Sequence, residues 1–396
     1  MRTASLLPLL CCGCFLLPKG TPPPAPGPAA PSAAGVWELS DGTTLDISGH
    51  PQDFWGVAAR PPGAQPPRVL LSAIAYDGRE LSLVVLAPDG PETLLAKVSA
   101  GGALEGRLAN KPIRGQRKSD VPSRALQALD LEPVGRGVLS TGAGESFTAL
   151  APGGREIFFS RHDESWGHHA LHTARLGDDG KWGQVSVLKI SGRGWNDREP
   201  ALSPDGKELW FSSNRSPDGL GEPGKTQQLW VSDRIPQGGW AEPHRLEAPV
   251  NSGADDSGPS LTADGTLYFS SRRPGGLGQA DLYRARRNGK GYDAPENLGP
   301  NVNGKGDESG PFVSPDERVL VFVSRERPES EGGDDLYVSH REGAGWGKAR
   351  HLGAPVNSFA NDYGPSLSPD GKWLYFTSHR RGNGDLYRVE AGILSP

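Results

Sequence analysis

The stretch LSPDGKELWFSSNR, residues 202–215, joins a short apolar run, a Pro-Asp-Gly turn and a second run that alternates aliphatic or aromatic residues with polar ones. Proline presets φ, aspartate bonds locally and glycine tolerates positive φ, so the centre of this stretch predicts a tight turn between two antiparallel strands. A closely similar sequence recurs three times, as LTADGTLYFSSRR from Leu261, VSPDERVLVFVSRER from Val313 and LSPDGKWLYFTSHRR from Leu367. A sequence motif that recurs along a chain indicates a repeated structural unit.

Aligning the chain on itself gives five copies of this unit. A Gly-rich loop follows the second predicted strand, a third strand begins with Asp-Leu-Tyr, and a Gly-Trp or Gly-Tyr turn opens a fourth. Four short antiparallel strands in just over 50 residues make one propeller blade. The residues that open the first strand of each copy are Thr148, in a degenerate first copy, and then Pro200, Pro259, Pro311 and Pro365.

The last copy lacks a fourth strand of its own. The segment Leu131–Val134 (LEPV), ahead of the first copy, resembles Leu246–Val250 (LEAPV), so we expect it to complete the last blade and to remove an open sheet edge. This closure predicts five blades, or six if part of residues 60–125 supplies another.

The phrases SPDGKELWFSS, GGDDLYVS and APVNS resemble the WD-like Pro-Asp-Gly repeat of TolB-like propellers, which are periplasmic and outer-membrane-associated proteins. The resemblance covers residues 128–392. It implies an all-β fold and a protein that binds other proteins, although related propellers serve as scaffolds for enzymes.

The first 20 residues read as an export signal. Arg2 precedes an apolar stretch too short to span a bilayer, and all three cysteines, Cys11, Cys12 and Cys14, lie within it. Gly13-Cys14 resembles the end of a bacterial lipobox, so the chain is expected to be lipidated at Cys14 or else cleaved near Ala33-Ala34-Gly35. Residues 21–35 form a stiff Pro/Ala-rich tether. The predicted location is the periplasm or, by a lipid anchor, the outer membrane; otherwise the protein is secreted.

Residues 36–125 alternate apolar and polar residues around Asp-Gly turns, which predicts a small antiparallel β-sandwich or half-barrel of four to seven strands. Residues 111–123 (KPIRGQRKSDVPS) are basic and polar, and we expect them to link this domain to the propeller of residues 126–396. The 55 glycines and 37 prolines favour a turn-rich β protein, and a net charge of −5 provides no basic field for nucleic acid.

One acid stands three residues before each blade-opening position, and one arginine near the end of each second strand. Since the first strand of a blade lines the channel, the acids are expected at one channel mouth. They are either a cation or partner site or acceptors of hydrogen bonds from a neighbouring blade's serine or arginine, which would fix how the blades abut, and the second interpretation is favoured. The acids are Glu145, Asp197, Asp256, Glu308 and Asp362; the arginines are Arg161, Arg215, Arg272, Arg325 and Arg380.

The segment RHDESWGHHALH, residues 161–172, is dense in imidazoles and carboxylates. It offers His162, His168 and His172 as metal ligands, but its spacing matches no known metal motif, and alignment places His172 on the tyrosine of the third strand. The segment is a metal site or a polar loop, and the second interpretation is favoured.

The sequence favours a non-catalytic binding or scaffolding protein of the bacterial cell envelope, without a cofactor, whose propeller loops dock a protein or a cell-wall glycan. The alternative is a secreted carbohydrate-active hydrolase in which Asp197, Asp256 and Asp362, from different blades, act as the catalytic carboxylates. No G-x-S-x-G elbow is present to support a serine hydrolase.

Overall fold

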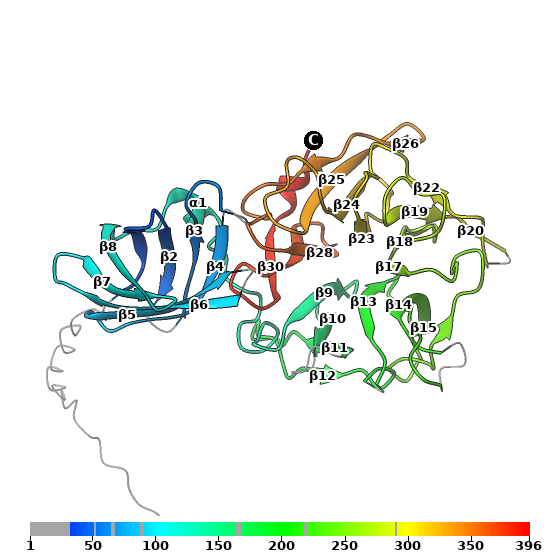
Figure 1. The fold of residues 1–396 in the computed structure, drawn as a ribbon. Coiled ribbons are helices and arrows are strands. Elements are labelled where there is room, and N and C mark those ends of the chain that lie inside the picture. The colour runs from blue at the N-terminus through cyan, green and yellow to red at the C-terminus, as the bar shows by residue number, and fades with distance from the viewer. Residues whose placement is uncertain are drawn as a thin grey trace, which may run out of the picture.

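The computed structural model describes residues 32–50, 53–64, 68–87, 90–162, 168–192, 194–216, 221–289 and 291–396. These residues form a small β-barrel and, beside it, a five-bladed β-propeller (Figure 1). Two short helices occur in them, α1 (Arg124–Ala128) and the 3-10 helix η1 (Ala391–Leu394). Neither is long and apolar enough to cross a membrane. The expected export signal, Cys14 and most of the tether lie outside the described residues.

The N-terminal domain is a closed barrel of eight antiparallel strands in chain order, so the expected sandwich or half-barrel is corrected. Every strand pairs with the next, and the last pairs with the first through Trp37↔Arg117 and Leu39↔Gly115. Inward-facing aliphatic residues around Trp37 fill the interior. The strands are β1 (Gly35–Leu39), β2 (Thr44–His50), β3 (Asp53–Ala59), β4 (Arg68–Tyr76), β5 (Glu80–Ala87), β6 (Gly90–Val98), β7 (Ala103–Leu108) and β8 (Lys111–Ser119).

The expected linker of residues 111–123 is wrong over most of its length, because β8 belongs to the barrel. This strand can carry basic side chains because most of them face solvent. Lys118 pairs with Glu38 at 3.0 Å, and Arg114 pairs with Glu105 at 3.3 Å. Ile113 alone points into the core as a buried apolar residue. Backbone pairing with two neighbours, rather than an alternating apolar pattern, therefore makes this segment a strand.

The connector between the two domains begins after β8 and contains α1, which Ser123 caps by accepting a hydrogen bond from the amide of Leu126 at 3.1 Å. Trp55 and Val57 of the barrel pack with Leu126 and Leu129 of the connector. Phe359 of the propeller joins this cluster. The barrel is thus packed directly against the propeller.

Each blade is an antiparallel sheet with its first strand innermost. The first strands contact one another in the cyclic order β9, β13, β17, β23, β28 and back to β9, which shows five blades. The strands are β9 (Glu145–Leu150), β10 (Glu156–His162), β11 (His169–Arg175) and β12 (Ser186–Val187) in blade 1; β13 (Asp197–Leu202), β14 (Glu208–Ser213), β15 (Gln228–Asp233) and β16 (His244–Arg245) in blade 2; β17 (Asp256–Leu261), β18 (Leu267–Ser271), β19 (Asp281–Ala285) and β22 (Glu296–Asn297) in blade 3, with the side hairpin β20 (Arg287–Asn288) and β21 (Gly291–Tyr292); β23 (Glu308–Val313), β24 (Val319–Ser324), β25 (Asp335–Glu342), β26 (Gly345–Trp346) and β27 (Arg350–His351) in blade 4; and β28 (Asp362–Leu367), β29 (Trp373–Ser378) and β30 (Asp385–Glu390) in blade 5.

The propeller core lies between blades. Five separate apolar clusters are each shared by two adjacent blades; one, for example, joins Phe158 and Leu171 of blade 1 to Phe211 and Trp230 of blade 2. Full burial of such a side chain contributes roughly 1.5–3 kcal/mol. A blade is therefore stabilised mainly by its neighbours, as in other repeat folds.

The ring closes with the segment that the sequence predicts, but residues 131–134 do not form a regular strand, and Val134 rather than Leu131 takes the place of Leu246. The amide of Val134 donates to the carbonyl of Leu386 at 2.7 Å, just as Leu246 donates to Leu229 at 3.0 Å within blade 2. The hydroxyl of Ser140 accepts from the amide of Leu386, a position held by the side chain of Asn251 in blade 2.

Candidate functional site

A carboxylate stands at the start of the first strand of every blade, and none of the five has exposed area. The interpretation of these acids as an exposed cation or partner site does not fit this burial, whereas the favoured interpretation, that they accept hydrogen bonds, does; the arginines, however, come from the same blade rather than a neighbouring one. Each is bound by an arginine of its own blade and by at least one hydroxyl, an arrangement that we name the acid socket. The socket acids are Glu145, Asp197, Asp256, Glu308 and Asp362.

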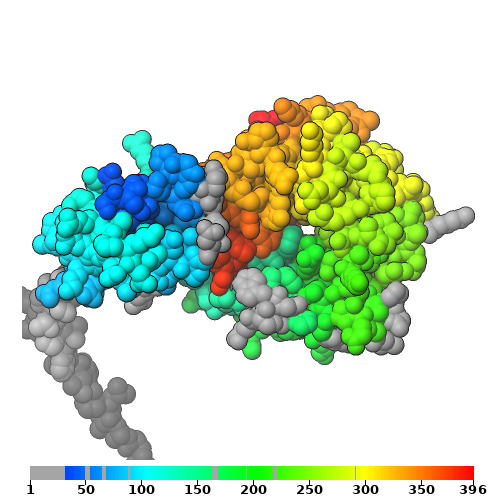
Figure 2. Space-filling model, viewed as in Figure 1, coloured from blue at the N-terminus to red at the C-terminus, as the bar shows by residue number. Residues whose placement is uncertain are grey.

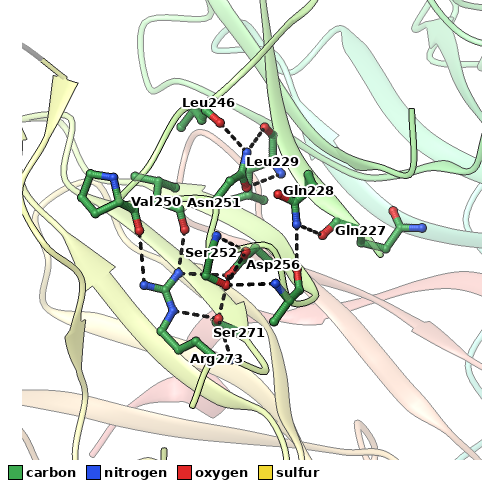
Figure 3. A network of polar contacts seen from close by, with 12 residues as sticks. Gln227, Gln228, Leu229, Leu246, Val250, Asn251, Ser252, Asp256, Ser271 and Arg273 are labelled. Atoms are coloured by element: carbon green, nitrogen blue, oxygen red, sulfur yellow. Dashed lines mark hydrogen bonds and ion pairs between the residues drawn. The ribbon is translucent and has the colours of Figure 1, made fainter. Parts of the chain in front are cut away.

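The socket of blade 3 shows the arrangement (Figure 3). Nη2 of Arg273 and the hydroxyl of Ser271 donate to Oδ1 of Asp256 at 3.0 and 2.6 Å. The amide and hydroxyl of Ser252 donate to Oδ2 at 2.6 and 2.9 Å. Arg273 also donates to the carbonyl of Val250 at 2.6 Å. These charge-assisted bonds fix the first strand to the loop that enters the blade.

Three of the five expected arginines lie in sockets. The distances to their acids are 2.8 Å for Arg161 and Glu145, 2.8 Å for Arg215 and Asp197, and 3.2 Å for Arg380 and Asp362. Burial raises the pKa of Asp362 above its ordinary value, and the guanidinium of Arg380 opposes that shift.

The pairing expected for Arg272 and Arg325 is wrong. Arg272 reaches Asp307 at 2.8 Å, Arg325 binds Asp334, and both guanidinium groups are substantially exposed. The residues that take their places in the sockets are Arg273 for Asp256 and Arg327 for Glu308.

A sequence signal for the socket arginines was present in the second strand. The guanidinium of Arg273 lies over the ring of Phe269 at 5.1 Å, and that of Arg327 lies over Phe322 at 5.5 Å. Counting from this phenylalanine, rather than from the end of the strand, finds Arg215, Arg273 and Arg380 four residues later and Arg327 five residues later.

The three candidate hydrolase acids, Asp197, Asp256 and Asp362, are socket acids. A catalytic acid or nucleophile must contact the substrate, whereas these carboxylates have no exposed area and their oxygens accept internal hydrogen bonds. The geometry gives them a role in joining strands and loops.

The histidine segment is described only in part, since residues 163–167 lie outside the described range. His172 stacks on Phe159 with ring centroids 5.8 Å apart, as Tyr283 stacks on Phe269 at 6.2 Å, so it holds the aromatic place of the third strand. Burial lowers the pKa of His172. Among the described residues, no group of three or more His, Cys, Asp or Glu side chains is arranged to hold a metal ion.

The first strands enclose a central cavity of about 490 Å³, and the hollow at the centre of the propeller is visible in Figure 2. The cavity reaches from the middle of the first strands to the Pro-Asp-Gly turns. Its lining is mainly proline and apolar side chains, including Phe312, which is half-buried and faces the cavity rather than a core cluster. A concave apolar surface with few polar groups is the usual form of a binding site.

Phe147 and Glu199 lie at the end of this cavity that is nearest the acid sockets and were not among the expected site residues. Both have left-handed backbones, with φ of 48° and 58°. The self-alignment held a signal for them: at this place, two residues after the socket acid, the other three blades have glycine.

No protein-family model matches the chain. TolB from Acinetobacter baumannii is similar to it at 16% identity and a TM-score of 0.42, over 90% of this chain and 77% of that one. A thermostable family-43 glycoside hydrolase is similar at 13% identity and a TM-score of 0.46, over 64% of this chain and 91% of that one. The endo-arabinanase of Bacillus licheniformis is similar at 12% identity and a TM-score of 0.42, over 64% and 96%. These similarities assign no activity, and the propeller fold is established by the ring of five first strands.

Proposed function

We propose that this chain is a non-catalytic docking protein of the bacterial cell envelope, which holds a segment of a partner protein in the central cavity of its propeller. The observation that carries the proposal is the contrast between the two parts of the channel: the carboxylates are enclosed in sockets, while the cavity presents an apolar surface. Apolar concavities favour side chains of a protein segment over a polar glycan.

The sequence supplies the envelope part of the proposal. An export signal would take the chain across the inner membrane, and Cys14 would carry the lipid anchor. The Pro/Ala tether ahead of the barrel would then hold the propeller away from the membrane. The barrel, packed against the propeller through Trp55, would act as a rigid spacer.

The test is capture from envelope extracts with residues 32–396 as bait. The variant Phe312→Ala removes an aromatic side chain from the cavity wall, and the matched control Val187→Ala alters a side chain that is 48% exposed on an outer strand. We expect one protein to be retained by the unmodified bait and the control and to be lost with Phe312→Ala.

Equal retention by all three baits would place docking elsewhere and contradict the proposal. The same baits are incubated with isolated cell-wall glycan. Release of sugars, or retention of glycan in place of protein, would establish the hydrolase or glycan-binding alternative instead.

A further inference from the structure

In every blade the residue two positions after the socket acid has a left-handed backbone, and Phe147, Glu199, Gly258 and Gly310 of this set line the central cavity. We name this set the left-handed ring. In three blades the residue is glycine, for which positive φ is unstrained, and in blades 1 and 2 it is Phe147 and Glu199. The φ angles are 48° for Phe147, 58° for Glu199, 64° for Gly258, 51° for Gly310 and 64° for Gly364.

The left-handed backbone of these two positions is imposed by the blades. The amide of Phe147 donates to the hydroxyl of Thr377 at 3.1 Å, and that of Glu199 to the hydroxyl of Ser160 at 3.0 Å, each in the preceding blade. A side chain with a Cβ is strained there, and such strain is concentrated at functional sites. Glycine would relieve the strain at both positions. The presence of a phenylalanine and a glutamate there therefore suggests that their side chains have a function.

The ring of Phe147 lies among residues of blades 4 and 5 at one end of the cavity. It lies 5.3 Å from the ring of Tyr363, centroid to centroid. A Cβ built on Gly310 or Gly364 would approach the ring of Phe147 to 3.1 or 3.0 Å, so the glycines of the left-handed ring leave room for it. The aromatic side chain therefore occupies the space beside these two glycines and forms part of the cavity wall.

Glu199 places a carboxylate at the same end. Its Oε2 accepts hydrogen bonds from the hydroxyl of Ser212 at 2.5 Å and from the amide of Gly258 at 2.8 Å, which orient the group. Its Oε1 has one charged neighbour within ion-pair distance in the described structure, Nε of Arg198 at 3.7 Å, a distance too long for a hydrogen bond. Oε2 of Glu199 is thus held by two hydrogen bonds, and Oε1 can accept a hydrogen bond from a ligand.

The other ionisable side chain among the described residues that line the cavity is Asp316, in a Pro-Asp-Gly-type turn. Its carboxylate accepts from the hydroxyl of Ser314 at 2.6 Å and from the amide of Arg318 at 3.3 Å, as such turns require. Glu199 is therefore the charged group that a ligand would meet at the end of the cavity where Phe147 lies.

We propose that Glu199 selects the occupant of the cavity: a protein segment that carries a basic side chain, Lys or Arg, on an otherwise apolar stretch. The inference rests on the proposed docking function and names the chemistry of the partner. An ammonium or guanidinium group would complete the hydrogen bonding of Oε1, and the apolar walls, by excluding water, would strengthen the pair. A neutral apolar segment would fill the same walls and leave the carboxylate without a partner.

The test uses two peptides that differ in one group, N-acetyl-Leu-Leu-Lys-amide and N-acetyl-Leu-Leu-norleucine-amide, titrated calorimetrically into residues 32–396. We expect the lysine peptide to bind at least about tenfold more tightly, since a hydrogen bond to a charged group contributes enough for such a factor. Glu199→Gln keeps the shape of the side chain and should remove the difference. Equal affinities in the unmodified protein, or no binding of either peptide, would overturn the inference.

Folding of the variants is checked separately. Glycine suits the left-handed backbone, so Glu199→Gly should unfold at the same denaturant concentration as the unmodified protein or a higher one, while losing the preference for lysine. A large fall in the midpoint for both variants would show that Glu199 serves mainly to tie blade 2 to blade 3.

The capture experiment distinguishes the two proposals. If the partner is retained equally by the unmodified bait and by Glu199→Gln but is lost with Phe312→Ala, docking stands and the recognition of a basic group is refuted. If the unmodified bait retains no protein and neither peptide binds, both proposals fail.

Discussion

The amide of Val134 donates a hydrogen bond to the carbonyl oxygen of Leu386 at 2.7 Å, and this bond joins the segment ahead of blade 1 to the third strand of blade 5. In the other blades the corresponding bond lies within one continuous repeat. The chain therefore closes its ring with a segment that precedes the repeats, and the two ends of the propeller stabilise each other. In Figure 1, β30 of blade 5 lies beside the barrel and blade 1.

Replacing Val134 by proline should weaken this closure. Proline has no amide hydrogen, so the buried carbonyl of Leu386 would lose its donor, at a cost of about 1–3 kcal/mol in the free energy of unfolding. Val134→Ala, which keeps the amide, is the control for the lost side chain. Urea denaturation measures both, and equal destabilisation would show that the hydrogen bond does not matter.

Removing one member of an acid socket should be far more damaging than removing a surface ion pair. Asp256→Asn removes the fully buried carboxylate and leaves the mostly buried guanidinium of Arg273 without its counter-ion, and we expect a loss of about 3 kcal/mol. Asp178→Asn removes the exposed partner of Arg155 and should leave the unfolding midpoint unchanged. A midpoint for Asp256→Asn within error of the unmodified protein would contradict a structural role for the sockets.

The aspartate of a Pro-Asp-Gly turn should release its proton at unusually low pH. The hydroxyl of Ser203, and after it Lys207, lowers the pKa of Asp205 to about 2. Because the folded value lies below the unfolded one, the contribution of Asp205 to stability is present above about pH 4 and is lost as the pH falls towards 2. Carbon-13 NMR of the aspartate carboxyl groups follows this titration, and Ser203→Ala should move the pKa of Asp205 upward. An unchanged pKa in that variant would show that the hydroxyl is not its main cause.

The position of the barrel should depend on one carboxylate. Asp130 accepts hydrogen bonds from Ser48 and Trp55 of the barrel, at 2.9 and 3.2 Å, and from Arg381 of blade 5 at 2.8 Å. We expect Asp130→Ala to free the barrel from the propeller, which small-angle X-ray scattering would detect as a larger radius of gyration.

Arg114→Ala, on the exposed side of the barrel, is the control for this change. An unaltered scattering curve for Asp130→Ala would mean that the apolar contacts around Trp55 suffice to hold the two domains together.

The propeller could be predicted because its information is local and repeated. Each turn is specified by adjacent residues such as Ser203-Pro204-Asp205-Gly206, and the regular recurrence of the turns sets the number of blades. The barrel could be predicted only as an antiparallel β domain. Its closing strand carries a single buried aliphatic residue, Ile113, and one of its two pairing partners, β1, lies at the other end of the domain.

The candidate site divides in the same way. The sequence by itself determined the five copies of the repeat, the acid at the head of each first strand and the use of residues 131–134 in the closure, because these follow from contiguous patterns; that no sixth blade comes from residues 60–125 was decided by the barrel they form. Only the tertiary structure decided that the acids are enclosed, that Arg273 and Arg327 rather than their neighbours reach them, and that Phe147 and Glu199 line a central cavity. Those facts depend on which groups from different blades converge at the propeller axis, and on backbone conformations that the neighbouring blades impose, which no local pattern records.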